Sequence, residues 1–232
     1  PTMFAGAATG AYQALYFGSV VSVGVTVATV VSLGLAPVLV TVAESVQARQ
    51  RPSGESLAVV AVALTGLVLV SSTAGFGETG PRPLLGVLLA VASGTTYAVT
   101  TMTAARVAPT TTPLALTTVT TTTGALVLAP LGLWGARGEA PLITADPVTV
   151  GMLAYLGVAT MALAYGLLYA GLRTTPSSAA VVASLLEPVT ATLVAATFLD
   201  ERLGVAGVIG TLLILAAVAG LGREAAPPVP PP

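Results

Sequence analysis

The chain contains the string Ala11-Tyr12-Gln13-Ala14-Leu15-Tyr16-Phe17-Gly18 and, much later, the near-copy Ala164-Tyr165-Gly166-Leu167-Leu168-Tyr169-Ala170-Gly171. The two strings are identical at five of eight positions, and both tyrosines are among the identities. Each string is followed, at nearly the same offset, by an apolar stretch with an interior proline, Pro37 in the first case and Pro188 in the second. Chance could produce one of these matches but hardly both, so we predict an internal repeat.

The composition around these strings is typical of a membrane protein. Of 232 residues, 55% are hydrophobic and only 7% are charged, and the mean hydropathy is +0.95. An ordinary soluble domain is about 25% charged, so this chain has too few charges to build a surface that faces water. We therefore predict an all-α fold, a polytopic bundle of transmembrane helices.

A helix needs about 20 mainly apolar residues to cross a hydrocarbon core roughly 30 Å thick. The charges, prolines and glycine clusters divide the chain into eight apolar segments, each a predicted span: 3–21, 23–43, 56–73, 84–105, 114–134, 148–171, 177–199 and 204–221. The glycines of the last segment, Gly204 and Gly210 among them, predict close packing between helices. The hydroxyls of the Thr-rich stretch 110–123 are expected to bond carbonyls one turn back in their own helix.

The two copies of the repeat are predicted to be inverted. The first copy lies in the first predicted span and the second copy in the sixth, so the chain crosses the membrane five times from one to the other, and an odd number of crossings turns the second copy upside down. Inverted repeats are a hallmark of secondary transporters, whose solute site lies near mid-membrane between the halves. A full pair would have ten spans, so residues 1–75 are expected to be the last three helices of a first repeat, preceded by two further spans. Residues 76–223 are expected to be the five helices of the second repeat, and the proline-rich residues 224–232 a disordered tail.

The arginines predict the orientation in the membrane. Numbering the loops alternately puts five arginines on one side and three on the other, and positive charge collects in the cytoplasm. The cytoplasmic set is Arg49, Arg51, Arg106, Arg173 and Arg223, and the other set is Arg82, Arg137 and Arg202. We therefore expect a multi-pass protein of the cytoplasmic membrane, with its C-terminus in the cytoplasm.

The end of the second repeat carries a family resemblance. It has the strings Ser184-Leu185-Leu186-Glu187-Pro188-Val189 and Leu199-Asp200-Glu201-Arg202-Leu203, followed by Gly207 and Gly210. In these features the chain resembles the drug/metabolite transporter superfamily, EamA type, whose members have ten spans in two five-helix repeats. The resemblance implies a secondary transporter that exports or exchanges small organic metabolites or drugs by alternating access, with amino acids among the candidates. A truncated or degenerate membrane protein that mediates interactions without transport is the alternative.

Glu187 is the sharpest candidate for a functional residue, because it lies about ten residues into its predicted span. At 1.5 Å per residue this is about 15 Å deep, near mid-membrane, where a charge costs at least a few kcal/mol. Such a carboxylate could carry a proton during transport. The other interpretation is a helix-start or kink residue whose carboxyl group bonds a neighbouring hydroxyl. Its counterpart in the first repeat is Ala36, so coupling through this position would be asymmetric.

Other candidates come from the repeat itself. The two prolines are each expected to remove a backbone hydrogen bond and to bend a helix that lines the cavity. Tyr16 and Tyr169, near helix ends, suit an aromatic belt better than a cavity. The full set of candidate substrate-binding or coupling residues is Glu187, Pro188, Ser184, Tyr165, Tyr12, Pro37, Tyr97 and Gln13.

Several classes of chemistry are disfavoured by what the sequence lacks. The chain has no His, no Cys and no Lys, which argues against zinc sites, thiol chemistry and a phosphate-binding loop with its lysine. With one intramembrane carboxylate there is no pair for acid and base chemistry, so we expect no enzyme activity and no cofactor. The expected partners are a small organic solute and the lipid bilayer, with a homodimer as a further option. The net charge of −1 predicts no nucleic-acid partner.

Overall fold

The computed structural model describes residues 1–73, 80–135, 146–198 and 204–224. Within them, all regular secondary structure is helical, which confirms the predicted all-α class. The elements are α1 (Thr2–Val23), α2 (Val25–Gln47), α3 (Gly54–Thr73), α4 (Pro83–Val107), η1 (Ala108–Thr110), α5 (Pro113–Gly135), α6 (Pro147–Tyr155), η2 (Leu156–Leu163), α7 (Ala164–Gly171), α8 (Ser177–Ala183), α9 (Leu186–Phe198) and α10 (Val205–Glu224). The predicted 199–203 turn and, apart from Glu224 at the end of α10, the 224–232 tail lie outside the described residues.

Five helices of the described part are long and apolar enough to cross a membrane: Val25–Gln47, Gly54–Ser72, Pro83–Thr110, Pro113–Trp134 and Pro147–Gly171. Two shorter apolar helical stretches follow them, Ser177–Ala191, which spans α8 and the start of α9, and Val205–Gly220 in α10. The predicted first span forms α1, which is 22 residues long but is not one of these five. Together the helices form the polytopic bundle that the composition predicts.

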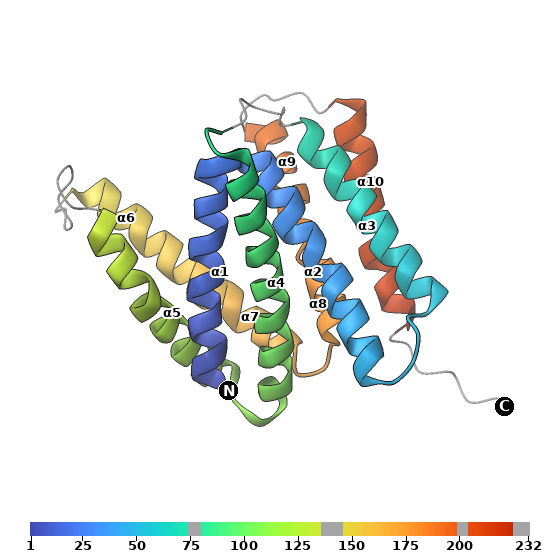
Figure 1. The fold of residues 1–232 in the computed structure, drawn as a ribbon, viewed down its shortest axis with the longest axis horizontal. Coiled ribbons are helices and arrows are strands. Elements are labelled where there is room, and N and C mark those ends of the chain that lie inside the picture. Colours follow the sequence, from blue (N-terminus) through green and yellow to red (C-terminus); the bar gives the residue numbers. More distant parts are fainter. Residues whose placement is uncertain (74–79, 136–145, 199–203, 225–232) are drawn as a thin grey trace.

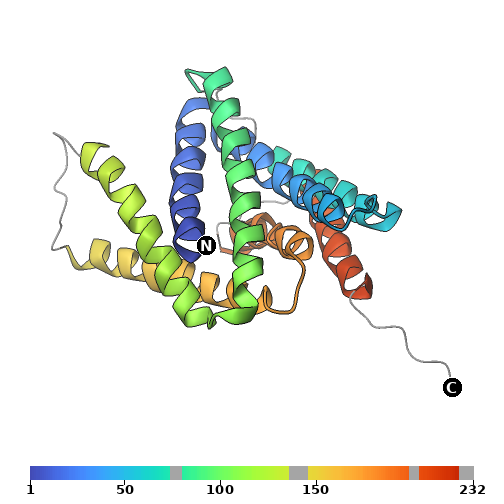
Figure 2. The same ribbon diagram turned by 60° about the horizontal axis from the view of Figure 1, so that its bottom comes forward.

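The long helices pack side by side. Helix α1 lies along α4 and α5, α2 lies along α4, and α3 pairs with α10 (Figure 1). The view in Figure 2 shows α5 splayed away from α1 at the end where α6 begins. The segment from α6 through η2 has no buried residue in the described structure, although it is strongly apolar. Its side chains are therefore available to lipid.

Glycines allow a close approach of helices α3 and α10. A Cβ added at Gly66 would lie 2.7 Å from the carbonyl oxygen of Gly210, and one added at Gly210 would lie 2.7 Å from the carbonyl oxygen of Gly66. The predicted packing role of Gly210 is confirmed. The same prediction is wrong for Gly204, because a Cβ there would meet nothing within 4 Å.

The threonines of α5 behave as predicted. The hydroxyls of Thr117, Thr118 and Thr121 donate to carbonyl oxygens four residues earlier, at 2.8, 2.9 and 2.7 Å. These polar groups are satisfied within their own helix, as the low polarity of a bilayer requires.

The predicted span 177–199 is not one continuous helix. It ends as α8 at Ala183 and starts again as α9 at Leu186, with a turn at Ser184 and Leu185 between them. Pro188 explains the position of this break, because a proline ring clashes with the carbonyl four residues back, which here is that of Ser184. The amide of Glu187 instead donates to the Ser184 carbonyl at 3.0 Å, a tighter turn than an α-helix has.

The two prolines therefore differ, which corrects the expectation that both bend a helix from within. Pro188 is the third residue of α9, where its missing N–H belongs to the first turn and costs no intrahelical bond. Pro37 lies inside α2, which continues through it, and its side chain is fully buried.

Candidate functional site

Side chains from three helices and the α8–α9 break meet in the interior of the bundle. The rings of Tyr12 on α1 and Tyr97 on α4 lie with their centroids 5.3 Å apart at an interplanar angle of 38°. The hydroxyl of Tyr97 donates to the Oγ of Ser184 at 3.2 Å. The hydroxyl group of Tyr165 on α7 interacts with that of Tyr12. We call Tyr12, Tyr97, Tyr165, Ser184 and Glu187 the tyrosine cluster.

Glu187 provides the charge of the tyrosine cluster. It lies in the first turn of α9 and interacts electrostatically with Tyr12 and Tyr97. Its side chain is exposed, and within the described residues no hydrogen bond or ion pair engages its carboxylate. Of the two sequence interpretations, the structure supports a helix-start position but not the hydroxyl bond that was expected with it. The carboxylate is available to a ligand.

Five of the eight candidate residues thus belong to the tyrosine cluster. The other three, Pro188, Pro37 and Gln13, do not. Pro188 follows Glu187 and is half-buried. Pro37 is buried within α2. Gln13 is half-buried on α1, and within the described residues its side chain makes no hydrogen bond. The structure gives Gln13 no link to the tyrosine cluster.

Tyr169 is placed differently from its prediction. It was expected in an interfacial belt, but it is 1% exposed and its hydroxyl donates to Thr120 Oγ1 at 3.1 Å. Its ring meets that of Tyr165 edge-on, with centroids 5.8 Å apart. Tyr169 therefore packs behind the tyrosine cluster and holds α7 against α5.

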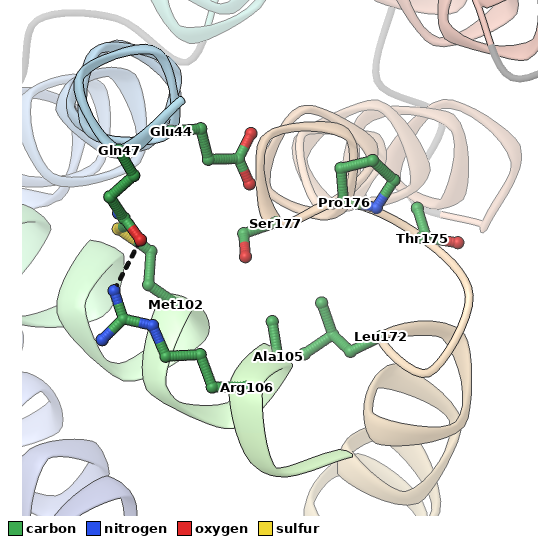
Figure 3. A pocket seen from close by; sticks show the side chains of 9 residues that line it. All are labelled: Glu44, Gln47, Met102, Ala105, Arg106, Leu172, Thr175, Pro176 and Ser177. Carbon is green, nitrogen blue, oxygen red and sulfur yellow. Dashed lines mark hydrogen bonds between the residues drawn. The ribbon is translucent and has the colours of Figure 1, made fainter. Parts of the chain in front are cut away.

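A polar cavity that sequence reasoning missed lies near the ends of α2 and α4 (Figure 3). It has a volume of about 270 Å³ and its lining residues are Glu44, Gln47, Met102, Ala105, Arg106, Leu172, Thr175, Pro176 and Ser177. We call this cavity the vestibule. The guanidinium of Arg106 donates to Gln47 Oε1 at 2.7 Å, and Glu44 Oε1 accepts from the Ser178 amide at 3.2 Å. In the sequence, Glu44 and Arg106 can only be recognised as charged residues at the ends of two helices. Nothing in the sequence indicates that they line the same cavity.

A buried apolar group contacts both the vestibule and the tyrosine cluster. Ala36 and Val40 of α2, Ala98 of α4 and Val181 of α8 form a buried core, which we call the apolar plug. Tyr97 and Met102 pack against this plug. Tyr97 belongs to the tyrosine cluster and Met102 lines the vestibule, so the plug contacts a residue of each.

The described residues offer no metal centre: no group of three or more His, Cys, Asp or Glu side chains comes together among them. The ligands that this arrangement can hold are organic. Aromatic faces, hydroxyls and one carboxylate can bind a small molecule by its rings and its polar groups.

Comparison with known proteins agrees with the fold. The chain is 32% identical over 204 residues to the uncharacterized transporter YwfM of Bacillus subtilis (strain 168), covering 88% of this chain and 67% of that protein. A solved crystal structure matches 97% of this chain and 76% of its own with a TM-score of 0.78, at 22% sequence identity, which supports the fold alone. Residues 84–223 match the model of the EamA-like transporter family. The chain is a multi-pass membrane transporter that belongs to the EamA-like transporter family.

Proposed function

We propose that this protein is a secondary transporter that exports or exchanges small organic metabolites or drugs across the cytoplasmic membrane by alternating access. The solute site in this proposal is the tyrosine cluster. A transporter needs a site that both halves of the molecule share, near the middle of the bilayer.

One observation carries the proposal: Tyr12 and Tyr165 are equivalent residues of the two repeat strings, and they lie close enough to interact electrostatically. This is the contact expected on the axis that relates two inverted halves. It supports the division into a partial first repeat, residues 1–75, and a second repeat, residues 76–223. In the same proposal, rocking of one half against the other opens and closes the two sides of the site in turn.

The vestibule and the apolar plug fit one state of such a cycle. The vestibule is adjacent to Arg106, which the distribution of arginines assigns to the cytoplasmic side. The plug contacts Met102 of the vestibule and Tyr97 of the tyrosine cluster, and in this proposal it blocks passage from one to the other. The Glu44 carboxylate also holds the first turn of α8 against α2. We interpret this arrangement as a conformation closed towards the cytoplasm.

In our proposal the energy comes from a gradient, and Glu187 couples it. Its carboxyl group would be protonated in one half of the cycle and ionised in the other. The titratable groups that face it are Tyr12 from α1 and Tyr97 from α4. Because Ala36 occupies the equivalent position in the first repeat, one proton site serves both orientations.

The test is solute uptake and counterflow in proteoliposomes that contain the full-length protein, with and without an imposed pH gradient. The panel combines amino acids and drug-like compounds, and wild type is compared with Glu187→Gln. Glu55→Gln is the matched control, since Glu55 lies in the first turn of α3, outside the tyrosine cluster. We expect uptake that follows the gradient in wild type and in Glu55→Gln but not in Glu187→Gln. Uptake that ignores both the gradient and the Glu187 substitution would leave a transporter without this coupling. No uptake of any panel compound would favour a non-transporting role.

A further inference from the structure

We infer that the tyrosine cluster selects organic amine or ammonium cations over zwitterions and anions of the same shape. The inference rests on the proposed function, because it assigns a substrate class to the proposed solute site. It follows from the charges, the hydrogen-bond directions and the ring faces of the tyrosine cluster.

The charge of the tyrosine cluster is purely negative. Glu187 is its only ionisable acid, and its other members are neutral tyrosines and a serine. The chain has no Lys and no His, so arginine alone could supply a cation. Among the described residues, the arginines lie in connecting segments or in the last turn of a helix. The nearest along α4, Arg106, is nine residues beyond Tyr97, about 14 Å along the helix. A carboxylate on a solute would find no positive partner here.

The hydrogen-bond directions favour a donor as the ligand. Tyr97 donates its hydroxyl hydrogen to Ser184 Oγ, and Ser184 donates its own to the Val181 carbonyl at 2.8 Å. Both hydrogens are therefore used within the protein. The Tyr97 oxygen can therefore only accept a hydrogen bond from a ligand, and the same is true of the ionised Glu187 carboxylate. An ammonium group supplies N–H donors to both.

The aromatic faces suit a positive charge. The rings of Tyr12 and Tyr97 lie 5.3 Å apart at a tilt of 38°, and both tyrosines interact electrostatically with Glu187. A cation within about 6 Å of a ring centroid is attracted by the negative ring face, and more strongly where water is excluded. An anion at the same place is repelled by the rings and by Glu187.

A zwitterion is disfavoured by its carboxylate. Its ammonium group could pair with Glu187, but its carboxylate would lose water without a compensating positive charge and would lie near the negative charge of Glu187, which is costly in a site of low polarity. The tyrosine cluster therefore discriminates by charge even where the size and the hydrophobic part of the solute are the same.

The experiment uses three compounds that share a phenyl ring and differ in charge: 2-phenylethylamine, phenylalanine and 3-phenylpropionate. Their affinities for the purified full-length protein in detergent are measured by isothermal titration calorimetry at pH 7. Tetraethylammonium is added as a second cation that has no N–H donor. We expect 2-phenylethylamine to bind at least about tenfold more tightly than phenylalanine and 3-phenylpropionate.

Variants then assign the selectivity to residues. Glu187→Gln should weaken 2-phenylethylamine about tenfold or more and leave 3-phenylpropionate unchanged or improved, while Glu55→Gln changes neither. Tyr97→Phe keeps the ring face and should retain tetraethylammonium binding, whereas Tyr97→Leu should weaken it by about threefold or more. Thermal unfolding of each variant confirms that it is folded. The charge series on the wild-type protein needs no variant, so it tests the inference even if one does not fold.

Equal or tighter binding of phenylalanine or 3-phenylpropionate overturns the inference, and so does the absence of binding of both cations. Counterflow of the same compounds in proteoliposomes separates this outcome from failure of the proposed function. If 3-phenylpropionate is transported and the amine is not, the transport proposal is supported and the inferred substrate class is wrong. If the amine binds through Glu187 but no compound is transported, the inferred selectivity is supported and the transport proposal is wrong.

Discussion

The Tyr97 hydroxyl on α4 donates a 3.2 Å hydrogen bond to Ser184, the residue at which the helix that begins as α8 is broken. Ser184 stands four residues before Pro188, whose ring prevents the helix from continuing. One side-chain bond thus ties α4 to the turn that sets the direction of α9, and therefore to the position of Glu187.

Loss of this bond is expected to destabilise the bundle, and the effects of substituting its two partners are not expected to add. Ser184→Ala leaves the half-buried Tyr97 hydroxyl without its acceptor and should lower the free energy of unfolding by about 1–3 kcal/mol, whereas Tyr97→Phe should cost about 1 kcal/mol. Because Tyr97→Phe removes the stranded hydroxyl, the double variant should be no less stable than Ser184→Ala alone. Denaturant unfolding in detergent measures the cycle. Additive losses would mean that the two side chains do not interact.

The contact between α3 and α10 should not tolerate a methyl group. At Gly210 a Cβ would lie 2.7 Å from a backbone oxygen of Gly66, so Gly210→Ala must push the helices apart and should cost about 1–3 kcal/mol. Gly151→Ala is the matched control, since a Cβ at Gly151 in α6 would meet nothing within 4 Å. Removing glycine from that helix should be neutral or stabilising by up to about 1 kcal/mol. Equal melting temperatures for the two variants would contradict the close approach.

The closed state predicts a pattern of chemical labelling, which is simple to measure because the chain has no cysteine. A cysteine at Val181 in the apolar plug, where the side chain is 1% exposed, should react slowly with a soluble maleimide. A cysteine at the exposed Gln47 position should react fast. Adding Glu44→Ala to Val181→Cys removes the carboxylate that holds the Ser178 amide, so labelling should accelerate by about threefold to tenfold. An unchanged rate would show that this bond does not keep the plug closed.

Asp146 should make the start of α6 sensitive to acid. Its carboxylate caps the helix by accepting from the Thr149 hydroxyl at 2.7 Å and from the Thr149 amide at 2.8 Å. These two bonds hold the pKa of Asp146 below its ordinary value. A carboxyl group with a lowered pKa in the folded state stabilises the fold at pH values above its unfolded-state pKa. That contribution is lost as the pH falls through the folded-state pKa.

Hydrogen exchange of the α6 amides measures this effect. Protection in the first turn should decrease as the solution is acidified below the ordinary pKa of an aspartate. Asp146→Asn is the control, because asparagine caps a helix about as well but does not titrate in this range. Loss of protection at the same pH in both proteins would assign the sensitivity to another group.

Much of the candidate site could be predicted one residue at a time. Tyr12 and Tyr165 stood out because the repeat strings share them, and Glu187 because it was the one acid well inside an apolar segment. The sequence could not tell that they meet, because the distance between Tyr12 on α1 and Glu187 on α9 depends on how the helices pack and not on spacing along the chain. For the same reason Tyr169 was assigned to an interfacial belt, although the structure buries it against Thr120.

The sequence by itself determined that this is a bundle of apolar helices. Satisfying every backbone group within a bilayer leaves few alternatives to the helix, and that requirement acts on each segment separately. The break at Ser184 is partly local as well, since Pro188 forbids the turn behind it. Only the tertiary structure decided that Glu44 and Arg106 line one vestibule, that the apolar plug packs against Met102 of that vestibule, and that Tyr12 and Tyr97 interact with Glu187. Each of these depends on contacts between helices that are far apart in the chain, and close packing, such as that of Gly66 on Gly210, fixes them.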